Sequence, residues 1–179
     1  MADLKNKVAI VTGARRGMGR AHALALAKAG AKVVVADISQ EECEKVVEEI
    51  KKAKGEAIAV KCDVTKKEEV DAMIQAAVKE WGKLDILVNN AGICQFKPFL
   101  EMTEKDWDLT LNINLKGYFL CAQAAAKEMM KQKSGAIVNI ASVAMGQIGV
   151  GFPGLTHYCA SKGGIVGMSE AMAIELSKN

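Results

Sequence analysis

The chain has 179 residues, of which 50% are hydrophobic and 25% charged, and its formal net charge is +3. This length can bury one substantial core, and nothing in it requires a second domain. Because the 24 lysine and arginine residues are interspersed with 21 acidic ones, no basic block or basic and aromatic stripe indicates a nucleic-acid partner.

The five cysteines are odd in number and far apart, and they form neither a CxxC pair nor the ligand spacing of a zinc site. We therefore expect reduced thiols and no metal site. The N-terminal residues lack an apolar signal region, and no run approaches the about 18 apolar residues of a membrane span. These features predict a soluble, cytoplasmic protein with no membrane partner.

The first predicted unit is a strand, a tight glycine turn and a helix. The apolar run at residues 8–11 precedes Gly13, Gly17 and Gly19, and an alanine-rich segment with good helix propensity follows. Glycine adopts positive φ and has no side chain, so the main chain can approach a bulky anion there, while the helix N-terminus presents N–H groups to it. The turn predicts a phosphate or pyrophosphate site.

A second strand is predicted over residues 32–37, a β-branched run that ends in a carboxylate. Ser39 and Glu42 have the spacing of a capping box at the start of a charged helix over residues 40–54. The third predicted strand covers residues 57–62. The order of strand, helix and strand thus repeats directly.

The next helix is predicted to be capped by Thr65 with Glu68 and to end at Gly82. A fourth strand over residues 84–88 leads into the Asn-Asn-Ala-Gly segment that ends at Gly92. This unit again pairs a helix with an apolar strand.

Thr103 and Asp106 predict the start of one long amphipathic helix that runs to about residue 131. The fifth strand is predicted over residues 136–140, and the last helix over residues 157–177. A glycine-rich connection joins these two elements.

The strands are continuous apolar runs that alternate with helices. This pattern indicates an α/β fold, a doubly wound Rossmann-type parallel sheet with helices on both faces. We treat residues 1–179 as a single dinucleotide-binding domain. Ligands bind beyond the carboxyl ends of such strands, and the polar residues expected to meet there are Gly13, Asp37, Asp63, Asn90 and Ser142.

Asp37 lies 18 residues beyond Gly19, close to the spacing at which a carboxylate meets the ribose hydroxyls of a dinucleotide. A carboxylate there repels a 2′-phosphate and favours NAD over NADP. Arg15 and Arg16 favour the opposite choice, because an arginine beside the adenosine can pair with that phosphate. We base the choice of NAD on Asp37, since it would contact the 2′-hydroxyl that distinguishes NAD from NADP.

Asp63 and Val64 follow the third strand. The carboxylate would accept a hydrogen bond from the adenine amino group, and the valine would pack on the ring. A turn that leads into the next helix is an equally open interpretation.

Tyr158 and Lys162 are four residues apart in the last predicted helix and so share one face. A phenol has a pKa of about 10, and a nearby ammonium favours its ionised form. Lys162 would therefore activate Tyr158 as a general base. The alternative is a buried tyrosine beside a solvated lysine. His157 is expected to project from another helix face, at the pocket edge or the surface.

Several separated motifs resemble the short-chain dehydrogenase/reductase family over essentially the whole chain. They are Thr12-Gly13-x-x-x-Gly17-x-Gly19, Asp63-Val64, Asn89-Asn90-Ala91-Gly92, Asn112-Ile113-Asn114-Leu115, Ser142 and Tyr158-x-x-x-Lys162. The resemblance implies that Tyr158 is the general acid/base, that Lys162 lowers its pKa and holds the nicotinamide ribose, and that Ser142 positions the substrate oxygen. It also implies that Asn114 holds a water that links Lys162 to solvent.

The implied reaction moves a hydride between a secondary alcohol carbon and nicotinamide, while Tyr158 takes or gives the hydroxyl proton. No metal is required. The resemblance also implies a homodimer or homotetramer. The residues expected to bind the cofactor are Gly13, Arg15, Arg16, Gly17, Met18, Gly19, Asp37, Asp63, Val64, Asn90, Ala91, Gly92, Tyr158 and Lys162.

Two departures from the family pattern stand out. Ser142 and Tyr158 are 16 residues apart, a long connection whose apolar residues favour a substrate with some hydrophobic surface or cover the core instead. Relatives normally continue beyond the last helix with further strands, so we expect the domain to be C-terminally incomplete and the fifth strand to form an exposed edge.

The leading hypothesis is an NAD(H)-dependent oxidoreductase that interconverts a small-molecule secondary alcohol and a ketone. One alternative is an NADPH-dependent 3-oxoacyl thioester reductase, because Arg16 could hold the extra phosphate. The other is a catalytically inert nucleotide-binding fragment.

Overall fold

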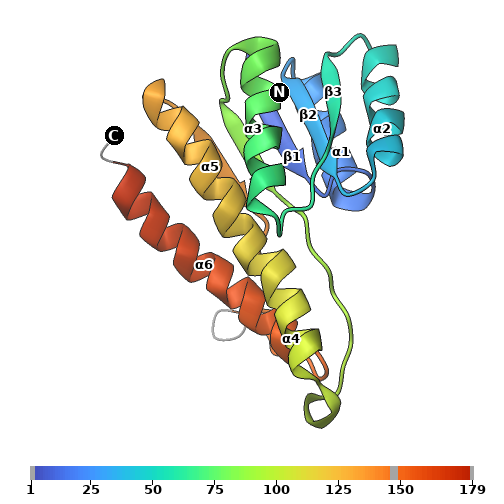
Figure 1. Cartoon of the computed structure of the whole chain (residues 1–179), viewed down its shortest axis with the longest axis vertical. Coiled ribbons are helices and arrows are strands. Elements are labelled where there is room, and N and C mark those ends of the chain that lie inside the picture. The colour runs from blue at the N-terminus through green and yellow to red at the C-terminus, as the bar shows by residue number, and fades with distance from the viewer. Residues whose placement is uncertain (1–2, 146–148, 178–179) are drawn as a thin grey trace.

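The computed structural model describes residues 3–145 and 149–177 (Figure 1). The elements in chain order are β1 (Val8–Thr12), α1 (Gly17–Lys28), β2 (Lys32–Asp37), α2 (Gln40–Lys52), β3 (Ala57–Lys61), α3 (Lys67–Trp81), β4 (Ile86–Asn89), η1 (Phe99–Glu101), α4 (Glu104–Leu111), η2 (Asn112–Lys116), α5 (Gly117–Lys131), β5 (Ala136–Asn139) and α6 (Thr156–Leu176).

The strands form one parallel sheet in the order β3-β2-β1-β4-β5. β1 lies at the centre, and the chain leaves it first towards β2 and β3 and later returns on its other side to β4 and β5. The strand order therefore reverses between β1 and β4, which is where open α/β sheets bind ligands. The predicted doubly wound fold is confirmed.

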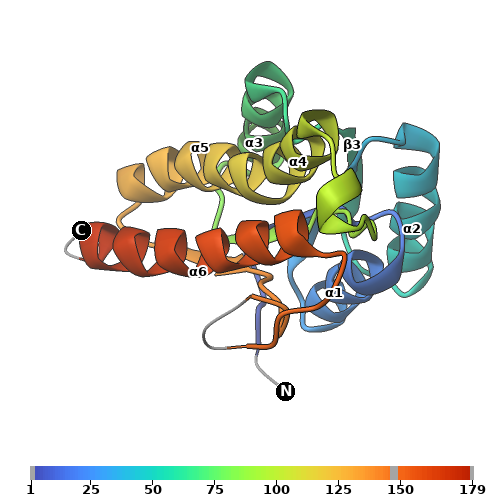
Figure 2. The same ribbon diagram turned by 90° about the horizontal axis from the view of Figure 1, so that it is seen from below.

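Helices cover both faces of the sheet (Figure 2). On one face α3 and α5 pack on alternate residues of the strands, with Ile10, Met73 and Cys121 fully buried between them. On the other face α1 and α2 pack on the intervening residues, such as Val11 and Val35. The inner strands β1, β2 and β4 bury side chains on both faces, which explains their continuous apolar sequence.

The helix starts confirm two of the three predicted caps. Thr103 and Asp106 form a complete capping box at α4, and the Ser39 hydroxyl accepts a hydrogen bond from the Glu42 N–H at 3.5 Å. The prediction for Thr65 is wrong, because its hydroxyl donates to the Asp63 carboxylate at 2.7 Å and α3 begins only after Lys66. A side-chain turn competes with the cap for that hydroxyl.

The long helix predicted from Thr103 to about residue 131 contains a π-helical turn, η2, between α4 and α5. Such turns insert one extra residue into a helix and often occur at functional sites. Sequence periodicity misses it because the apolar pattern continues on both sides. The turn contains Asn114, which is fully buried.

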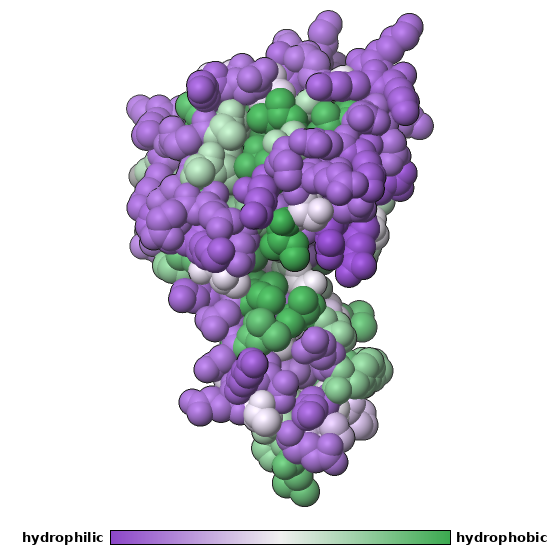
Figure 3. Space-filling view, turned by 45° about the vertical axis from the view of Figure 1, so that its right-hand side comes forward, coloured by the Kyte–Doolittle hydropathy of each residue, from purple (hydrophilic) through white to green (hydrophobic). Residues whose placement is uncertain are grey.

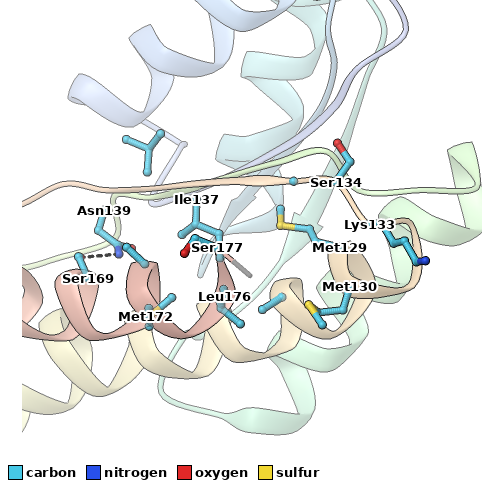
Figure 4. Close-up of a pocket in the computed structure, with 14 residues that line it drawn as sticks. Met129, Met130, Lys133, Ser134, Ile137, Asn139, Ser169, Met172, Leu176 and Ser177 are labelled. Carbon is cyan, nitrogen blue, oxygen red and sulfur yellow. Dashed lines mark hydrogen bonds between the residues drawn. The ribbon is translucent and has the colours of Figure 1, made fainter. Parts of the chain in front are cut away.

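β5 lies at the edge of the sheet, and Val138 is 47% exposed. Beside it, between the C-terminal parts of α5 and α6, lies a largely apolar hollow of about 680 Å³ (Figure 4). Met129 and Met172 contribute to it, and the Asn139 amide donates to the Ser169 hydroxyl at 2.9 Å. The expected exposed edge is confirmed. Among the described residues, no helix is long and apolar enough to span a membrane.

Candidate active site

The glycine turn after β1 is tightly packed against the loop after β4. Gly13 has φ of 65°, and a Cβ added to it would lie 2.7 Å from the Ala91 Cα. A Cβ added to Gly19 would overlap the carbonyl oxygen of Gly13. Both positions therefore require glycine, because the main chain itself forms the wall of the site.

Thr12 and Asn90 join the ends of β1 and β4. The Thr12 hydroxyl accepts hydrogen bonds from the main-chain N–H groups of Asn90 at 3.0 Å and Ala91 at 3.1 Å. The Asn90 amide in turn donates to the main-chain carbonyls of Thr12 at 3.0 Å and Gly13 at 3.1 Å. These bonds fix the turn against its neighbour at the point where the strand order reverses.

A pocket of about 350 Å³ opens at this point. All twelve predicted cofactor residues outside the Tyr158–Lys162 pair line it, namely Gly13, Arg15, Arg16, Gly17, Met18, Gly19, Asp37, Asp63, Val64, Asn90, Ala91 and Gly92. The structure thus brings together residues that are separated by up to 79 positions in the sequence (Gly13 to Gly92). Their role in cofactor binding stays a prediction.

Two aspartates in this pocket have partners from the chain itself. The Asp37 carboxylate accepts from the Arg15 N–H at 3.2 Å and forms an ion pair with the Arg15 guanidinium, also at 3.2 Å. Burial raises the pKa of Asp63, but hydrogen bonds from Thr65 and the charge of Lys66 outweigh it, so this pKa lies below its ordinary value. Asp63 is therefore a carboxylate at neutral pH.

Lys162 lies one turn beyond Tyr158 on α6 and is 4% exposed. Its ammonium donates to the Ile140 carbonyl at 2.6 Å, and it lies 5.7 Å from the centroid of the Tyr158 ring. Burial lowers the pKa of Lys162 to about 8, with a small opposing contribution from Cys94. The predicted tyrosine and lysine pair is thus formed, and the lysine is buried rather than solvated.

Asn114 connects three segments. Its carbonyl oxygen accepts from the Ile93 N–H at 2.8 Å, and its amide donates to the Ile93 carbonyl at 2.9 Å and to the Ser161 hydroxyl at 3.2 Å. Ser161 donates to the Tyr158 carbonyl at 2.7 Å. Asn114 therefore holds the first turns of α6 against the loop after β4, and its predicted water stays a prediction.

Ser142 lies on the loop two residues beyond Ile140, where its hydroxyl accepts from the Ala144 N–H at 3.1 Å. Its predicted contact with the substrate oxygen is untested. Of the long connection to Tyr158, residues 146–148 lie outside the described residues, and with them the predicted apolar contribution of Ile148. Phe152 and Val150 are 45% and 60% exposed.

The prediction for His157 is wrong. Its side chain is fully buried in the first turn of α6, and neither ring nitrogen has a hydrogen-bond partner among the described residues. The helix-face argument did not include the packing of α4 against α6, which the structure shows. Sequence analysis also missed Ser161 and Tyr118, and the Tyr-x-x-x-Lys motif offered a signal only for Ser161, which lies inside it.

These features define a Rossmann-type protein with a glycine-lined pocket and, on α6, a half-buried tyrosine one turn from a buried lysine. A family model described as short chain dehydrogenase matches residues 7–179. The chain belongs to this family of oxidoreductases.

Curated relatives agree with this assignment. A 3-oxoacyl-[acyl-carrier-protein] reductase from Synechocystis is 46% identical over 178 residues, which are 99% of this chain and 71% of the relative. A (2S)-[(R)-hydroxy(phenyl)methyl]succinyl-CoA dehydrogenase subunit from Thauera aromatica is 42% identical over 175 residues, 98% of this chain and 69% of the relative.

The solved structures give the same result. A short-chain type dehydrogenase/reductase from Mycobacterium marinum matches with a TM-score of 0.93 and 39% identity, over 98% of this chain and 71% of the other. The fold of the described residues is therefore that of the family.

Proposed function

We propose that the protein interconverts a secondary alcohol and a ketone with NAD(H). The observation that carries this proposal is the burial of Lys162 beside Tyr158, one helical turn apart on α6. Asn114 joins this helix to Ile93, which lines the pocket at the strand-order reversal. The glycine turn supports the cofactor assignment, because Gly13 and Gly19 let the main chain pack closely just before and at the start of α1. The N-terminus of a helix presents N–H groups to an anion. When bound, the nicotinamide would accept or supply the hydride.

Side chains of the protein would transfer the proton of the substrate. The Tyr158 hydroxyl would take the proton of the alcohol during oxidation and return it during reduction. The Lys162 ammonium favours the phenolate of Tyr158, since opposite charges stabilise each other strongly at a buried site. Ser142 and Tyr158 would both donate hydrogen bonds to the substrate oxygen as negative charge develops on it.

The test is the Tyr158→Phe variant, which removes one oxygen and keeps the ring. We expect turnover to fall by about 10²–10⁴-fold, which is what general acid/base catalysis contributes, while the Kd for NAD stays within about twofold. Turnover is followed by the absorbance of reduced nicotinamide on a panel of secondary alcohols and ketones. Equal activity in the two proteins would refute the role of Tyr158.

A second candidate is an NADPH-dependent reduction of a 3-oxoacyl thioester, favoured by the name of the Synechocystis relative. The exposed apolar side chains of Phe96, Phe99 and Leu100 on the segment after β4 suit an acyl chain; Figure 3 shows apolar residues at this lower end of the molecule. Reduction of acetoacetyl-CoA with NADPH, compared with oxidation of simple alcohols with NAD, separates the two candidates. An inert nucleotide-binding protein would bind a cofactor and turn over neither substrate.

We also propose a homodimer or homotetramer. Phe119 on α5 and Ile174 on α6 are 46% and 70% exposed, on helices that run side by side (Figures 1 and 2). Sedimentation equilibrium measures the mass in solution, and a monomer at all concentrations would refute this proposal.

A further inference from the structure

Tyr118 is an aromatic residue at the catalytic lysine that the family motifs do not include. It is the second residue of α5 and is 1% exposed. The Lys162 ammonium lies 5.2 Å from the centroid of its ring, slightly closer than to the ring of Tyr158. The charge therefore lies between two aromatic rings, one from α5 and one from α6.

The hydroxyl of Tyr118 and the ammonium of Lys162 share one acceptor. Tyr118 donates to the Ile140 carbonyl at 3.3 Å, and Lys162 donates to the same oxygen at 2.6 Å. Ile140 is itself held by the sheet, because its N–H donates to the Asn89 carbonyl at 3.0 Å. The Ile140 carbonyl thus fixes the ring and the charge relative to each other.

The main chain of Tyr118 is fixed independently of its side chain. The Asn89 amide donates to the Tyr118 carbonyl at 3.2 Å. The preceding Gly117 packs so closely that an added Cβ would lie 2.7 Å from a Val64 methyl group. The position of Tyr118 is therefore set by the π-turn and its neighbours, and a substitution of the side chain leaves these main-chain anchors in place.

We propose that Tyr118 is a positioning residue that holds the Lys162 ammonium against Tyr158 through the face of its ring. This inference rests on the proposed function, in which that ammonium supports the phenolate. A cation over an aromatic face is attracted by the ring quadrupole, and the attraction grows when water is excluded. Burial removes the water that would otherwise stabilise the ammonium, and the attraction of the ring replaces part of that stabilisation.

The groups that face the lysine come from three segments. They are the Cys94 thiol after β4, the Tyr118 ring on α5 and the Tyr158 ring on α6. Burial is the main reason that the pKa of Lys162 is as low as about 8. Loss of the Tyr118 ring would remove an attraction that favours the charged form, so it lowers this pKa further.

The experiment measures the pKa of Lys162 directly. The amine is labelled with acetic anhydride at a series of pH values in the folded protein, and the labelled peptide is quantified by mass spectrometry. In Tyr118→Leu, which lacks the ring, we expect the pKa of Lys162 to fall by about one unit. In Tyr118→Phe, which keeps the ring, we expect it to stay within about 0.3 units.

The matched control is Phe119→Leu, which removes a ring from the next position of the same helix, where the side chain is 46% exposed. We expect no change in the labelling of Lys162 in this variant. If Tyr118→Leu does not fold, Tyr118→Met, which also lacks a ring, gives the same comparison. An unchanged or raised pKa in the ring-free variant, or an equal fall in Tyr118→Phe, would overturn the proposal.

Kinetics supply the second readout. In the ring-free variant we expect kcat for alcohol oxidation at pH 8 to fall about tenfold, with the KM for the alcohol unchanged. The pH at which kcat rises should shift upward. A purely structural role would lower stability and leave this profile unmoved. If the unaltered protein oxidises no alcohol on the panel, the proposed function fails, while the labelling result still decides the role of Tyr118.

Discussion

The Asp37 carboxylate, 10% exposed, forms an ion pair with Arg15 at the rim of the pocket. The two residues argued for different cofactors in the sequence, and their pairing explains how both fit one site. The arginine neutralises part of the negative charge that would repel a 2′-phosphate, yet the carboxylate remains at the end of β2, where a ribose would lie. In the proposed function, Asp37 would favour NAD over NADP, and its ion pair with Arg15 would reduce that preference.

The first prediction concerns this pair. In Asp37→Ala we expect the Kd for NAD to rise about tenfold, because a charged hydrogen bond contributes about 1.5–3 kcal/mol, and the Kd for NADP to fall, because Arg15 becomes free for the phosphate. Both constants are measured by fluorescence titration. Asp71→Ala, an exposed aspartate on α3, serves as the control. Tighter NADP than NAD binding in the unaltered protein would contradict the assignment.

The second prediction concerns Lys162 and pH. Its pKa in the folded protein, about 8, lies below the ordinary 10.5, so between these values the unfolded chain binds more protons and stability rises with pH. Below pH 8 the buried charge costs the folded state about 3 kcal/mol. We therefore expect Lys162→Met to abolish turnover and to raise the free energy of unfolding at pH 7 by about 2 kcal/mol.

This gain should shrink between pH 8 and 10.5 as the lysine of the unaltered protein becomes neutral. Urea unfolding at pH 7 and pH 9.5 measures it. The exposed Lys127→Met on α5 is the control and should show no such trend. A gain in Lys162→Met that is independent of pH would show that the charge is not the cause.

At the scale of single elements, Gly117 on α5 and Gly167 on α6 differ in how much room they leave for a side chain. A Cβ on Gly117 would meet the stiff Val64 side chain at 2.7 Å, whereas a Cβ on Gly167, in the middle of α6, would meet nothing within 4 Å. Gly117 is thus required by packing against the loop after β3. Gly167 has no such neighbour in the described part of the chain.

The third prediction compares these two glycines. We expect Gly117→Ala to lower the free energy of unfolding by about 1–3 kcal/mol through overpacking. Gly167→Ala should raise it by about 0.5–1 kcal/mol, because alanine loses less conformational freedom in a helix. Chemical denaturation checks both. A stabilised Gly117→Ala variant would contradict the close contact with Val64.

The elements also show what sequence patterns can and cannot predict. The capping box at Thr103 was predictable because both of its hydrogen bonds join residues only three positions apart, Thr103 and Asp106. Thr65 has the same pattern, but Asp63 two residues earlier accepts its hydroxyl. The π-turn at Asn114 and the burial of His157 depend on packing between α4, η2 and α6, and no local pattern records such packing.

The same distinction between local sequence patterns and packing between elements applies to the candidate site. Glycines and strand-end polar residues were predictable, since parallel strands bring their carboxyl ends to one rim. The depth of Lys162 and its contact with Tyr118 were not, because they require the positions of two helices and of the Ile140 carbonyl, which carries no side-chain signal.

At the scale of the whole molecule, the sheet is covered unevenly. β1 is fully buried between its neighbours, while β5 pairs with β4 on one side and faces the apolar hollow of Figure 4 on the other. Within residues 3–145 and 149–177 no strand pairs with that outer side. Open strand edges of this kind readily pair with another chain.

The fourth prediction follows from this edge. We expect Val138→Lys to reduce concentration-dependent association of this chain, because a charge on an edge strand opposes pairing. Sedimentation velocity over a range of concentrations measures the effect. Val138→Thr, which keeps a branched side chain without charge, should associate like the unaltered protein. Equal association of the lysine variant would exclude the β5 edge as the contact.

The Ile140 carbonyl that holds Lys162 comes one residue after the last residue of β5. In the proposed function, the position of the Lys162 ammonium therefore depends on main chain that directly follows β5, and local opening there would release it. A contact that stabilises β5 would then also hold this ammonium in place. The proposed proton transfer is thereby linked to the local stability of β5, although no predicted site residue lies within that strand.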